Sequence, residues 1–434
     1  MSSFLKRLHN FITFKSLSSK LRIKNSETKL QTITEKILST HAGKKVYAGE
    51  LAVVTVDGIM ASDTTAPYAI KAFEEMGGVK LWDAEKCTFV IDHASPAPNE
   101  RIANLHKFMR DFAIKQNIRL FDVGEGICHQ LIIERDLVRP GQVFIGADSH
   151  TCTYGSLNAF ATGVGSSDLA AVMLTGKIWL KVPETIKVIY KGALAKNIVA
   201  KDLILALEKI LGIDGATYQT LEFHGEIVEK LSLASRMTMA NMAIEMGAKA
   251  GIFTPKGLEL PYEWSPTYAD EDAKYIRTIE IDITNLNSQI AFPNSPDNVH
   301  DVQKAVGTPI QYAFVGTCTN GRLDDLHEVA DILKDKNIAS GVRLLIAPAS
   351  KQVFIDAMND GTAQILMQAG ATFLPSGCGP CVGSHLGVPG DGETVISAGN
   401  RNFKGRMGNP NAQVYLSSPS IVAKSALKGF ISNE

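Results

Sequence analysis

Ser376-Gly-Cys-Gly-Pro-Cys-Val-Gly383 and Gly316-Thr-Cys-Thr-Asn320 contain three of the six cysteines of this 434-residue chain. Three clustered thiols cannot complete a tetrahedral structural zinc site, which takes four ligands. They can hold three corners of a cubane iron–sulfur cluster and leave the fourth iron without a protein ligand. Because an iron with an open position is a Lewis acid, Cys318, Cys378 and Cys381 predict a catalytic cluster.

Glycines flank these cysteines. Gly377, Gly379 and Gly383 leave room for a bulky cluster and let backbone N–H groups approach its sulfides. The Cys-x-x-Cys pair alone also occurs in thioredoxin-like motifs and zinc knuckles. Three buried apolar cysteines are a further alternative, because cysteine without a disulfide is among the most buried residue types. The polar, glycine-rich surroundings of the three thiols favour the cluster.

The composition is that of a near-neutral globular protein. The chain has 44 basic and 45 acidic residues and is 45% hydrophobic. No charge excess points to nucleic acid or to a membrane surface, and no apolar run reaches the ~18 residues that a membrane span needs. Six cysteines in so long a chain do not form a secreted disulfide framework, so the sequence predicts a reducing compartment.

Strand-like runs alternate with helical stretches along the chain. The predicted strands are 53–56, 88–91, 143–145, 186–190, 343–346 and 394–397, and the predicted helices are 101–116, 201–211, 233–250 and 326–335. This alternation favours α/β sheets with helices on both faces. Val182-Pro-Glu184 and the Pro- and Asn-rich stretch 291–298 are predicted to be domain boundaries.

Asp92-His93 follows the predicted strand 88–91 and precedes two prolines. The carboxyl ends of α/β strands are where side chains reach a cleft. A carboxylate beside an imidazole keeps the histidine protonated near neutral pH, which suits a general acid that protonates a departing hydroxyl. For this dipeptide alone, a solvated loop histidine is the more frequent case.

Asp148-Ser-His150 follows another predicted strand, 143–145, and His129 ends the phrase Gly124-Glu-Gly-Ile-Cys-His129. A serine, two histidines and an aspartate would allow a hydrolase triad. Ser149 lacks the Gly-x-Ser-x-Gly phrase of a nucleophile elbow, so serine hydrolysis is not favoured.

For two further polar groups, the sequence pattern alone predicts no more than a position on the protein surface. Asn241 and Glu245 lie four residues apart on the predicted helix 233–250 and so share a face, and periodicity makes Glu245 a surface carboxylate. Arg401 and Arg406 follow the predicted strand 394–397. Their guanidinium forks match carboxylate geometry, which suits a dicarboxylate substrate. Taken alone, two solvated arginines are the more frequent case.

The other cysteines and a glycine pair give weaker signals. Cys152 lies two residues after the Asp-Ser-His phrase, but a fourth thiol ligand would fill the open position on iron. Cys87, Cys128 and Cys152 are therefore predicted to be structural. Gly163-Val-Gly165 is an incomplete dinucleotide fingerprint, because Asp168 stands in place of the third glycine, so no nicotinamide cofactor is expected.

From about residue 31 to residue 430 the chain resembles the large subunits of the isopropylmalate dehydratase group in the aconitase superfamily. The matching motifs, in the family's order, are Thr32-Ile-Thr-Glu-Lys-Ile-Leu38, Val90-Ile-Asp-His93, Gly146-Ala-Asp-Ser-His-Thr-Cys-Thr153, Asn241-Met-Ala-Ile-Glu245, Ser295-Pro-Asp-Asn-Val299, the two cysteine phrases, and Gly399-Asn-Arg-Asn-Phe-Lys-Gly-Arg406. The resemblance implies three α/β domains, 29–183, 184–288 and 289–434, around a central iron–sulfur cleft, without the fourth, swivelling domain of longer members.

The resemblance also implies roles for the polar residues. Asp92 and His93 would form the general acid, Asp148 would support His129, and His150 would pair with Glu245 to orient the bound hydroxyl or water. The implied substrate-binding residues are Asn241, Asn400, Arg401 and Arg406. Cys318, Cys378 and Cys381 would hold one 4Fe-4S cluster with one labile iron.

The implied reaction isomerises 2-isopropylmalate and 3-isopropylmalate by dehydration and rehydration, as in leucine biosynthesis. Homoaconitate and dimethylmalate- or citramalate-type substrates are alternatives. In the family the base that removes the carbon-bound proton is a serine on the swivelling domain, so a separate small subunit is expected to supply it together with part of the specificity. A non-catalytic, iron-responsive binding protein is a more distant alternative, and it would need a basic cleft and a fourth domain in the same chain.

Residues 1–28 differ from the rest of the chain, since they are basic and contain no acid before Glu27. Leu5, Leu8 and Ile12 fall on one helical face, which is the amphipathic, acid-poor pattern of an organelle transit peptide. An extension without a targeting role is the alternative. The expected location is the cytoplasm, or the matrix of a mitochondrion or plastid if this leader is a transit peptide.

Overall fold

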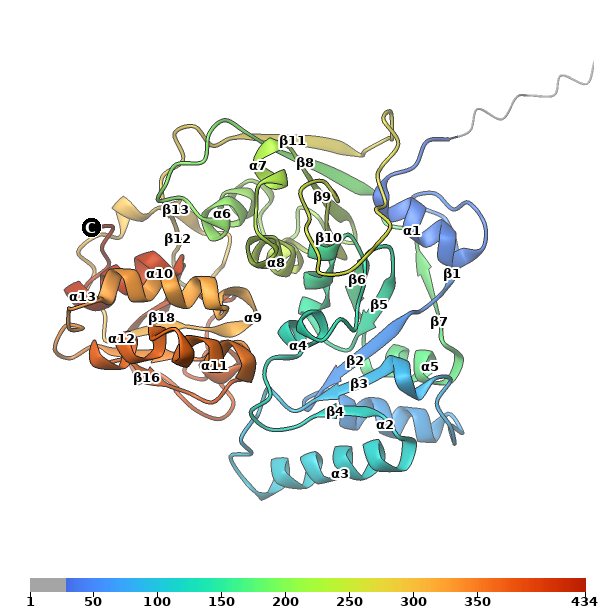
Figure 1. Cartoon of the computed structure of the whole chain (residues 1–434), viewed down its shortest axis with the longest axis horizontal. Coiled ribbons are helices and arrows are strands. Elements are labelled where there is room, and N and C mark those ends of the chain that lie inside the picture. The colour runs from blue at the N-terminus through green and yellow to red at the C-terminus, as the bar shows by residue number, and fades with distance from the viewer. Residues whose placement is uncertain (1–28) are drawn as a thin grey trace, which may run out of the picture. The chain divides into compact units, whose positions relative to one another are not determined.

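The first sheet consists of short parallel strands, of which the central strands β3, β2 and β5 are buried on both faces. In the computed structural model, which describes residues 29–434, its order is β4-β3-β2-β5-β6. The bounds are Arg119–Phe121, Cys87–Val90, Gly58–Ser62, Val143–Gly146 and Phe160–Gly163. Ile59 and Ile145 pack into one apolar core, whereas Met60 and Phe144 pack into another on the opposite face. Such two-sided burial is typical of a parallel sheet covered by helices (Figure 1).

Five helices accompany this sheet: α1 (Ile33–Ala42), α2 (Ala66–Glu75), α3 (Glu100–Gln116), α4 (Cys128–Glu134) and α5 (Ser166–Thr175). A capping box starts α1, because the Thr32 hydroxyl accepts from the Glu35 N–H and the Glu35 carboxylate accepts from the Thr32 N–H at 2.8 Å. β1 (Leu51–Thr55) and β7 (Lys177–Lys181) form a separate antiparallel pair. The predicted helix 101–116 is confirmed as α3.

The second sheet is parallel, with the order β10-β9-β8-β11. Its strands are Ala250–Phe253, Thr220–His224, Thr185–Lys191 and Arg277–Asp282, and its helices are α6 (Ala200–Leu211), α7 (Glu226–Glu229) and α8 (Leu233–Met242). The prediction of a helix over 233–250 is wrong beyond Met242. A 3-10 turn, Ala243–Met246, follows α8 and ends at Gly247, whose φ of 82° is left-handed, and the chain then enters β10.

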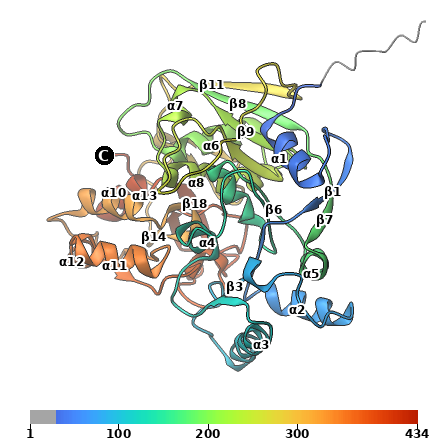
Figure 2. The same cartoon turned by 45° about the vertical axis from the view of Figure 1, so that its right-hand side comes forward.

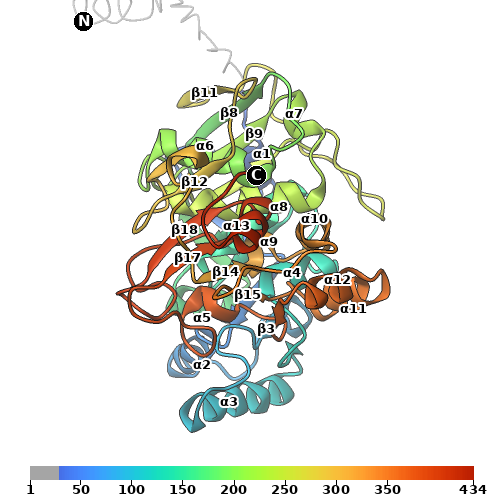
Figure 3. The same ribbon diagram turned by 90° about the vertical axis from the view of Figure 1, so that its left-hand side faces the viewer.

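The third sheet has the order β13-β12-β18-β17-β14-β15-β16. Its strands are Val299–Asp301, Gln289–Ala291, Gln413–Ser417, Thr394–Ser397, Tyr312–Val315, Arg343–Ile346 and Thr372–Phe373, and its helices are α9 (Thr317–Asn320), α10 (Leu323–Leu333), α11 (Lys351–Asn359), α12 (Thr362–Gln368) and α13 (Pro419–Lys428). Figure 3 shows α10, α11 and α12 together beside β14 and β15. The stretch 291–298 begins with the last residue of β12 and continues as the hairpin loop between β12 and β13.

The three larger sheets each take all their strands from one of the predicted ranges 29–183, 184–288 and 289–434. Backbone bonds join the first and third ranges, since the Ile127 N–H donates to Ala349 at 2.8 Å and the Cys378 N–H donates to Asp92 at 2.9 Å. Figure 2 shows α4 close to the orange and red elements of the third sheet. The segments that follow β3 and β4 therefore meet those that follow β16 and β15, while the division into three domains stays a prediction.

The predicted transit peptide lies outside the described residues. Within residues 29–434, none of the helices combines the length and the apolar character that a membrane crossing requires. The predicted α/β architecture is confirmed, and buried apolar clusters lie on both faces of the first and third sheets.

Candidate active site

His93 lies just past the carboxyl end of β3, between two carboxylates. Asp92 Oδ1 lies 2.8 Å from its Nδ1, and Asp148 Oδ2 lies 3.2 Å from its Nε2. Burial opposes the charged imidazole, but the Cys378 sulfur and the two carboxylates outweigh this cost and raise the pKa of His93 well above its ordinary value. These contacts favour the charged form of the ring, which can donate a proton.

Asp63, at the carboxyl end of β2, fixes the backbone that carries His93. Its carboxylate accepts the N–H groups of Asp92 at 3.1 Å, His93 at 2.8 Å and Ala94 at 2.8 Å, and it lies 3.2 Å from the ring Nε2 of His106. Burial opposes the carboxylate charge, but these donors outweigh it and lower the pKa of Asp63. Sequence reasoning missed this residue because β2 is not among the predicted strands, although the polar phrase Ser62-Asp-Thr-Thr65 marks the end of β2.

We expect Asp63→Ala to lower the free energy of unfolding by about 3 kcal/mol, because it leaves several buried N–H groups without an acceptor. The midpoint of denaturant unfolding measures this loss. Asp111→Ala is the control, since the Asp111 side chain is 59% exposed and pairs with Lys107 on the same helix; it should change stability by no more than about 0.5 kcal/mol. Equal midpoints for the two variants would contradict this role.

Asp148 follows β5 and organises two histidines. Its Oδ1 lies 2.7 Å from His129 Nε2 and accepts the backbone N–H of His150 at 2.8 Å. Burial raises the pKa of a carboxyl group, but the histidines that bond to Asp148 lower it well below its ordinary value. The Asp148–His129 contact that the resemblance implied is present, and the same carboxylate also reaches His93.

Glu245 connects the second sheet to the loop after β17. Its Oε1 lies 2.8 Å from His150 Nε2, and its Oε2 accepts a bond from Arg401 Nε at 2.8 Å. Burial acts against the charge, but His150 and Arg401 lower the pKa of Glu245. The expectation of a surface carboxylate is wrong, because α8 ends at Met242 and the following 3-10 turn buries Glu245, leaving it 4% exposed.

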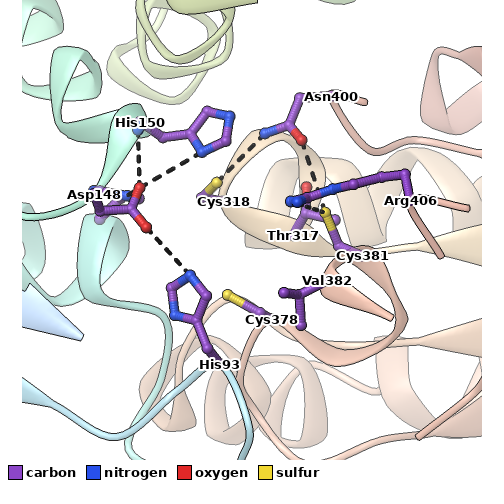
Figure 4. Close-up of a pocket in the computed structure, with 11 residues that line it drawn as sticks. His93, Asp148, His150, Thr317, Cys318, Cys378, Cys381, Val382, Asn400 and Arg406 are labelled. Carbon is purple, nitrogen blue, oxygen red and sulfur yellow. Dashed lines mark hydrogen bonds and ion pairs between the residues drawn. The ribbon is translucent and has the colours of Figure 1, made fainter. Parts of the chain in front are cut away.

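The three predicted cluster cysteines line one pocket. Cys318 lies on α9 directly after β14, Cys381 lies on the 3-10 turn Gly379–Val382, and Cys378 precedes that turn. The pocket is completed by His93, His129, Asp148, His150, Thr317, Val382, Asn400 and Arg406 (Figure 4). Thr317 and Val382 were not singled out as site residues, although both lie in the cysteine phrases.

Four predicted site residues do not line this pocket but bond to lining residues or to one another. Asp92 bonds to His93, Asn241 bonds to Asn400, Glu245 bonds to His150, and Arg401 bonds to Glu245. All thirteen predicted site residues thus belong to one bonded or pocket-lining set. Their roles in a reaction are not given by this placement.

N–H donors surround the cysteine sulfurs. Asn241 Nδ2 lies 3.1 Å from Cys318 Sγ, Asn400 Nδ2 lies 3.7 Å from the same sulfur, and Arg406 Nη2 lies 3.8 Å from Cys381 Sγ. Burial raises the pKa of Cys318 to about 12, so its sulfur becomes a thiolate only when a positive centre binds it. These donors suit sulfurs that carry negative charge.

The donor set fits a polynuclear cluster better than a single ion. Cysteine ligands about 2.3 Å from one tetrahedral zinc ion would lie roughly 3.8 Å from one another. Within residues 29–434, the three sulfurs belong to no common group of ligand atoms within 4.8 Å of one another, although they line the same pocket. Three sulfurs that line one pocket without meeting at one ion suit ligands to separate irons of a cluster. Two other groups, Asp92 with His93 and Cys378, and His129 with Asp148 and His150, have ligand atoms close enough to hold a single ion.

Cys87, Cys128 and Cys152 do not line this pocket. All three are buried, and burial raises the pKa of each thiol. Cys128 donates its backbone N–H to Asp92 Oδ2 at 2.8 Å, and the Cys152 thiol lies 3.4 Å from the backbone oxygen of Asn241. Their surroundings agree with the predicted structural role.

Comparison with known proteins identifies the family. The model of the Aconitase family (aconitate hydratase) matches residues 35–262 and 256–429. A protein named 3-isopropylmalate dehydratase large subunit 1, from Pyrococcus furiosus, is 47% identical over 414 residues, covering 93% of this chain and 98% of that protein. The homoaconitase large subunit of Thermus thermophilus is 44% identical over 404 residues, covering 92% and 96%.

A solved structure shows the same fold at lower sequence similarity. The holo-form of aconitase X from Thermococcus kodakaraensis superposes with a TM-score of 0.51 at 14% identity, covering 81% of this chain and 84% of that one. The predicted aconitase-type α/β architecture is thereby confirmed. With the family model spanning most of the described residues and near full-length relatives above 40% identity, the chain belongs to the aconitase family.

Proposed function

We propose that the chain is the large subunit of a hydro-lyase that interconverts 2-isopropylmalate and 3-isopropylmalate by dehydration and rehydration, a step of leucine biosynthesis. One observation carries this proposal: a chain 44–47% identical to proteins named 3-isopropylmalate dehydratase large subunit brings three cysteine sulfurs and three histidines into one pocket. The histidines are held by carboxylates, as acid–base chemistry on a hydroxy acid requires.

Cys318, Cys378 and Cys381 would hold a 4Fe-4S cluster, one per chain, with one exchangeable iron. When bound, such a cluster supplies a Lewis acid that binds the substrate's hydroxyl and carboxylate and stabilises the developing charge. Asn241, Asn400 and Arg406 direct N–H groups at the cysteine sulfurs and would stabilise their negative charge.

His93 is the proposed general acid. Asp92 holds Nδ1 at 2.8 Å, whereas Asp148 contacts Nε2 at the longer distance of 3.2 Å. We therefore assign the proton that moves to the departing hydroxyl to Nε2. Asp92 and Asp148 hold the ring in place and favour its charged form, which keeps this proton available near neutral pH. On rehydration, the same nitrogen takes the proton back from the attacking water.

The other polar residues are proposed to orient the substrate. His150, held by Glu245, would orient the hydroxyl or water, and His129 would be kept in position by Asp148. Arg406 lines the pocket and would clamp one substrate carboxylate. Arg401 uses its Nε for Glu245, and we assign its terminal nitrogens to a second carboxylate contact.

A separate small subunit would supply the base that removes the carbon-bound proton, in line with the large-subunit names of the relatives. We expect the cluster-loaded chain alone to show no turnover, because the base is missing and bound substrate stays exposed to water. Titrating the small subunit into a fixed amount of this chain should raise the rate to a plateau. Full turnover by the chain alone would show that the base lies within these 434 residues.

Homoaconitate is the second candidate substrate, because the homoaconitase large subunit of Thermus thermophilus is 44% identical to this chain, the same figure as for one of the isopropylmalate dehydratase relatives. The test compares kcat/KM of the reconstituted pair for 2-isopropylmalate, homoaconitate, dimethylmalate and citramalate. We expect isopropylmalate to be preferred by about tenfold or more. An apolar pocket that holds the isopropyl group loses contacts with the smaller methylated malates, and it disfavours the charged side chain of homoaconitate. A higher kcat/KM for homoaconitate would replace isopropylmalate as the proposed substrate.

A further inference from the structure

Lys201, in the first turn of α6, is fully buried and bonds to the loop that carries Asn400 and Arg401. Its side chain is among the largest that are completely enclosed. Nζ donates to the backbone oxygen of Ala398 at 3.1 Å and to that of Gly399. Lys201 thus links a helix of the second sheet to the loop that follows β17 of the third.

The environment of this ammonium is unusual. Burying a positive charge costs several kcal/mol unless a counter-charge pairs with it. Within residues 29–434, no carboxylate oxygen lies within 4.0 Å of Lys201 Nζ, so the backbone oxygens hold the charge. A methionine would fill a similar volume without this cost. The benefit of the lysine therefore lies in its contact with the loop.

The opposite side of this loop faces the active site. Asn400 Nδ2 donates to Asn241 Oδ1 at 3.0 Å and lies 3.7 Å from Cys318 Sγ, and Arg401 bonds to Glu245. The Gly399 oxygen and the Asn400 N–H share one rigid peptide plane. A bond from Lys201 to that oxygen therefore sets the orientation from which the Asn400 side chain extends.

We propose that Lys201 is a positioning residue: its ammonium holds the Gly399–Asn400 peptide so that Asn400 faces the cysteine sulfurs and Arg401 meets Glu245. Its effect on turnover rests on the function proposed above, whereas its effect on the loop rests on the hydrogen bonds alone. Misplacement of a substrate-orienting group by about 1 Å is enough to cost roughly 100-fold in rate.

The test replaces Lys201 by methionine in the cluster-loaded chain with its small subunit. We expect unchanged iron and sulfide content, a kcat lower by about 10- to 100-fold, and faster amide hydrogen exchange in peptides covering 398–402. Lys209→Met is the matched control, because Lys209 lies exposed on the same helix; it should behave like the wild type. Wild-type exchange and kcat in Lys201→Met would overturn the proposal.

Two further measurements separate positioning from space filling. Lys201 lines a cavity of about 220 Å³. In Lys201→Ala a small molecule in this cavity can fill the space that the side chain leaves. Propylammonium should restore part of the rate and exchange protection, whereas 1-propanol should not; equal effects would overturn the role of the charge.

If Lys201→Met does not fold, Lys201→Gln, which keeps N–H donors, should be less impaired than Lys201→Ala, and equal impairment would count against the proposal.

These readouts also separate this inference from the proposed function. If the wild-type pair does not convert isopropylmalate, the proposed function fails, and amide exchange of 398–402 still decides the role of Lys201. If the wild-type pair turns over and Lys201→Met matches it in rate and in exchange, the proposed function stands and the positioning role falls.

Discussion

Replacing Cys318, Cys378 or Cys381 by serine is expected to prevent stable assembly of the iron–sulfur cluster and to abolish turnover. Each sulfur lines the same pocket, and a three-cysteine set has no spare thiol ligand that could take the place of a missing one. Anaerobic reconstitution of the wild type should give about four irons and four sulfides per chain. Each serine variant should contain much less of both, as measured by iron and acid-labile sulfide analysis.

Cys128→Ser and Cys152→Ser are the matched controls, because these thiols are buried near the site but do not line the pocket. Both should keep the cluster, although a hydroxyl in an apolar environment will cost some stability. Unchanged iron and sulfide in all three ligand variants would contradict the assignment. A stoichiometric zinc ion in the anaerobically purified wild type would contradict it as well.

His93→Ala is expected to lower kcat by about 100-fold or more while the cluster spectrum stays unchanged. Removing a general acid costs about 10²- to 10⁴-fold, and His93 is the histidine held between Asp92 and Asp148. Because the ring is not among the proposed cluster ligands, iron and sulfide content should match the wild type. Steady-state kinetics with saturating small subunit, measured beside the absorption spectrum, check both parts.

His327→Ala serves as the control for this variant. His327 also pairs with an aspartate, Asp360, at 2.7 Å, but its side chain is 47% exposed and lies outside the pocket. Its removal should leave kcat within about twofold of the wild type, as expected of a surface ion pair. Near-normal activity of His93→Ala would remove His93 from the reaction.

Much of the fold could be predicted from apolar runs and helical spacing. The strands β3, β5, β8 and β15 and the helices α3 and α6 agree with the predicted ranges to within two residues at each end. The helix predicted over 233–250 failed because small and apolar residues continue past α8 and hide its end. The chain turns there at Gly247 for tertiary reasons, since Ala250 joins a parallel strand.

The site was predictable where polar phrases follow strands, as at Asp92, Asp148 and Cys318. The residues that sequence reasoning missed bond to loops that are far from them in the sequence. Asp63 holds a loop 29 to 31 residues away, and Lys201 holds one 197 to 198 residues away. Asp63 does lie in a polar phrase after a strand, but that strand was not predicted, and Lys201 lies in a helix with no such phrase. The partners of both residues are revealed only by the tertiary structure.

The central claim is that this chain is the cluster-bearing half of an enzyme acting on isopropylmalate. The most direct measurement mixes the anaerobically reconstituted chain with its small subunit and 3-isopropylmalate, and follows the products by proton NMR. The account predicts conversion to 2-isopropylmalate through an unsaturated intermediate, and none with the Cys381→Ser variant. Absence of conversion, with about four irons per chain retained and the small subunit in excess, would contradict it.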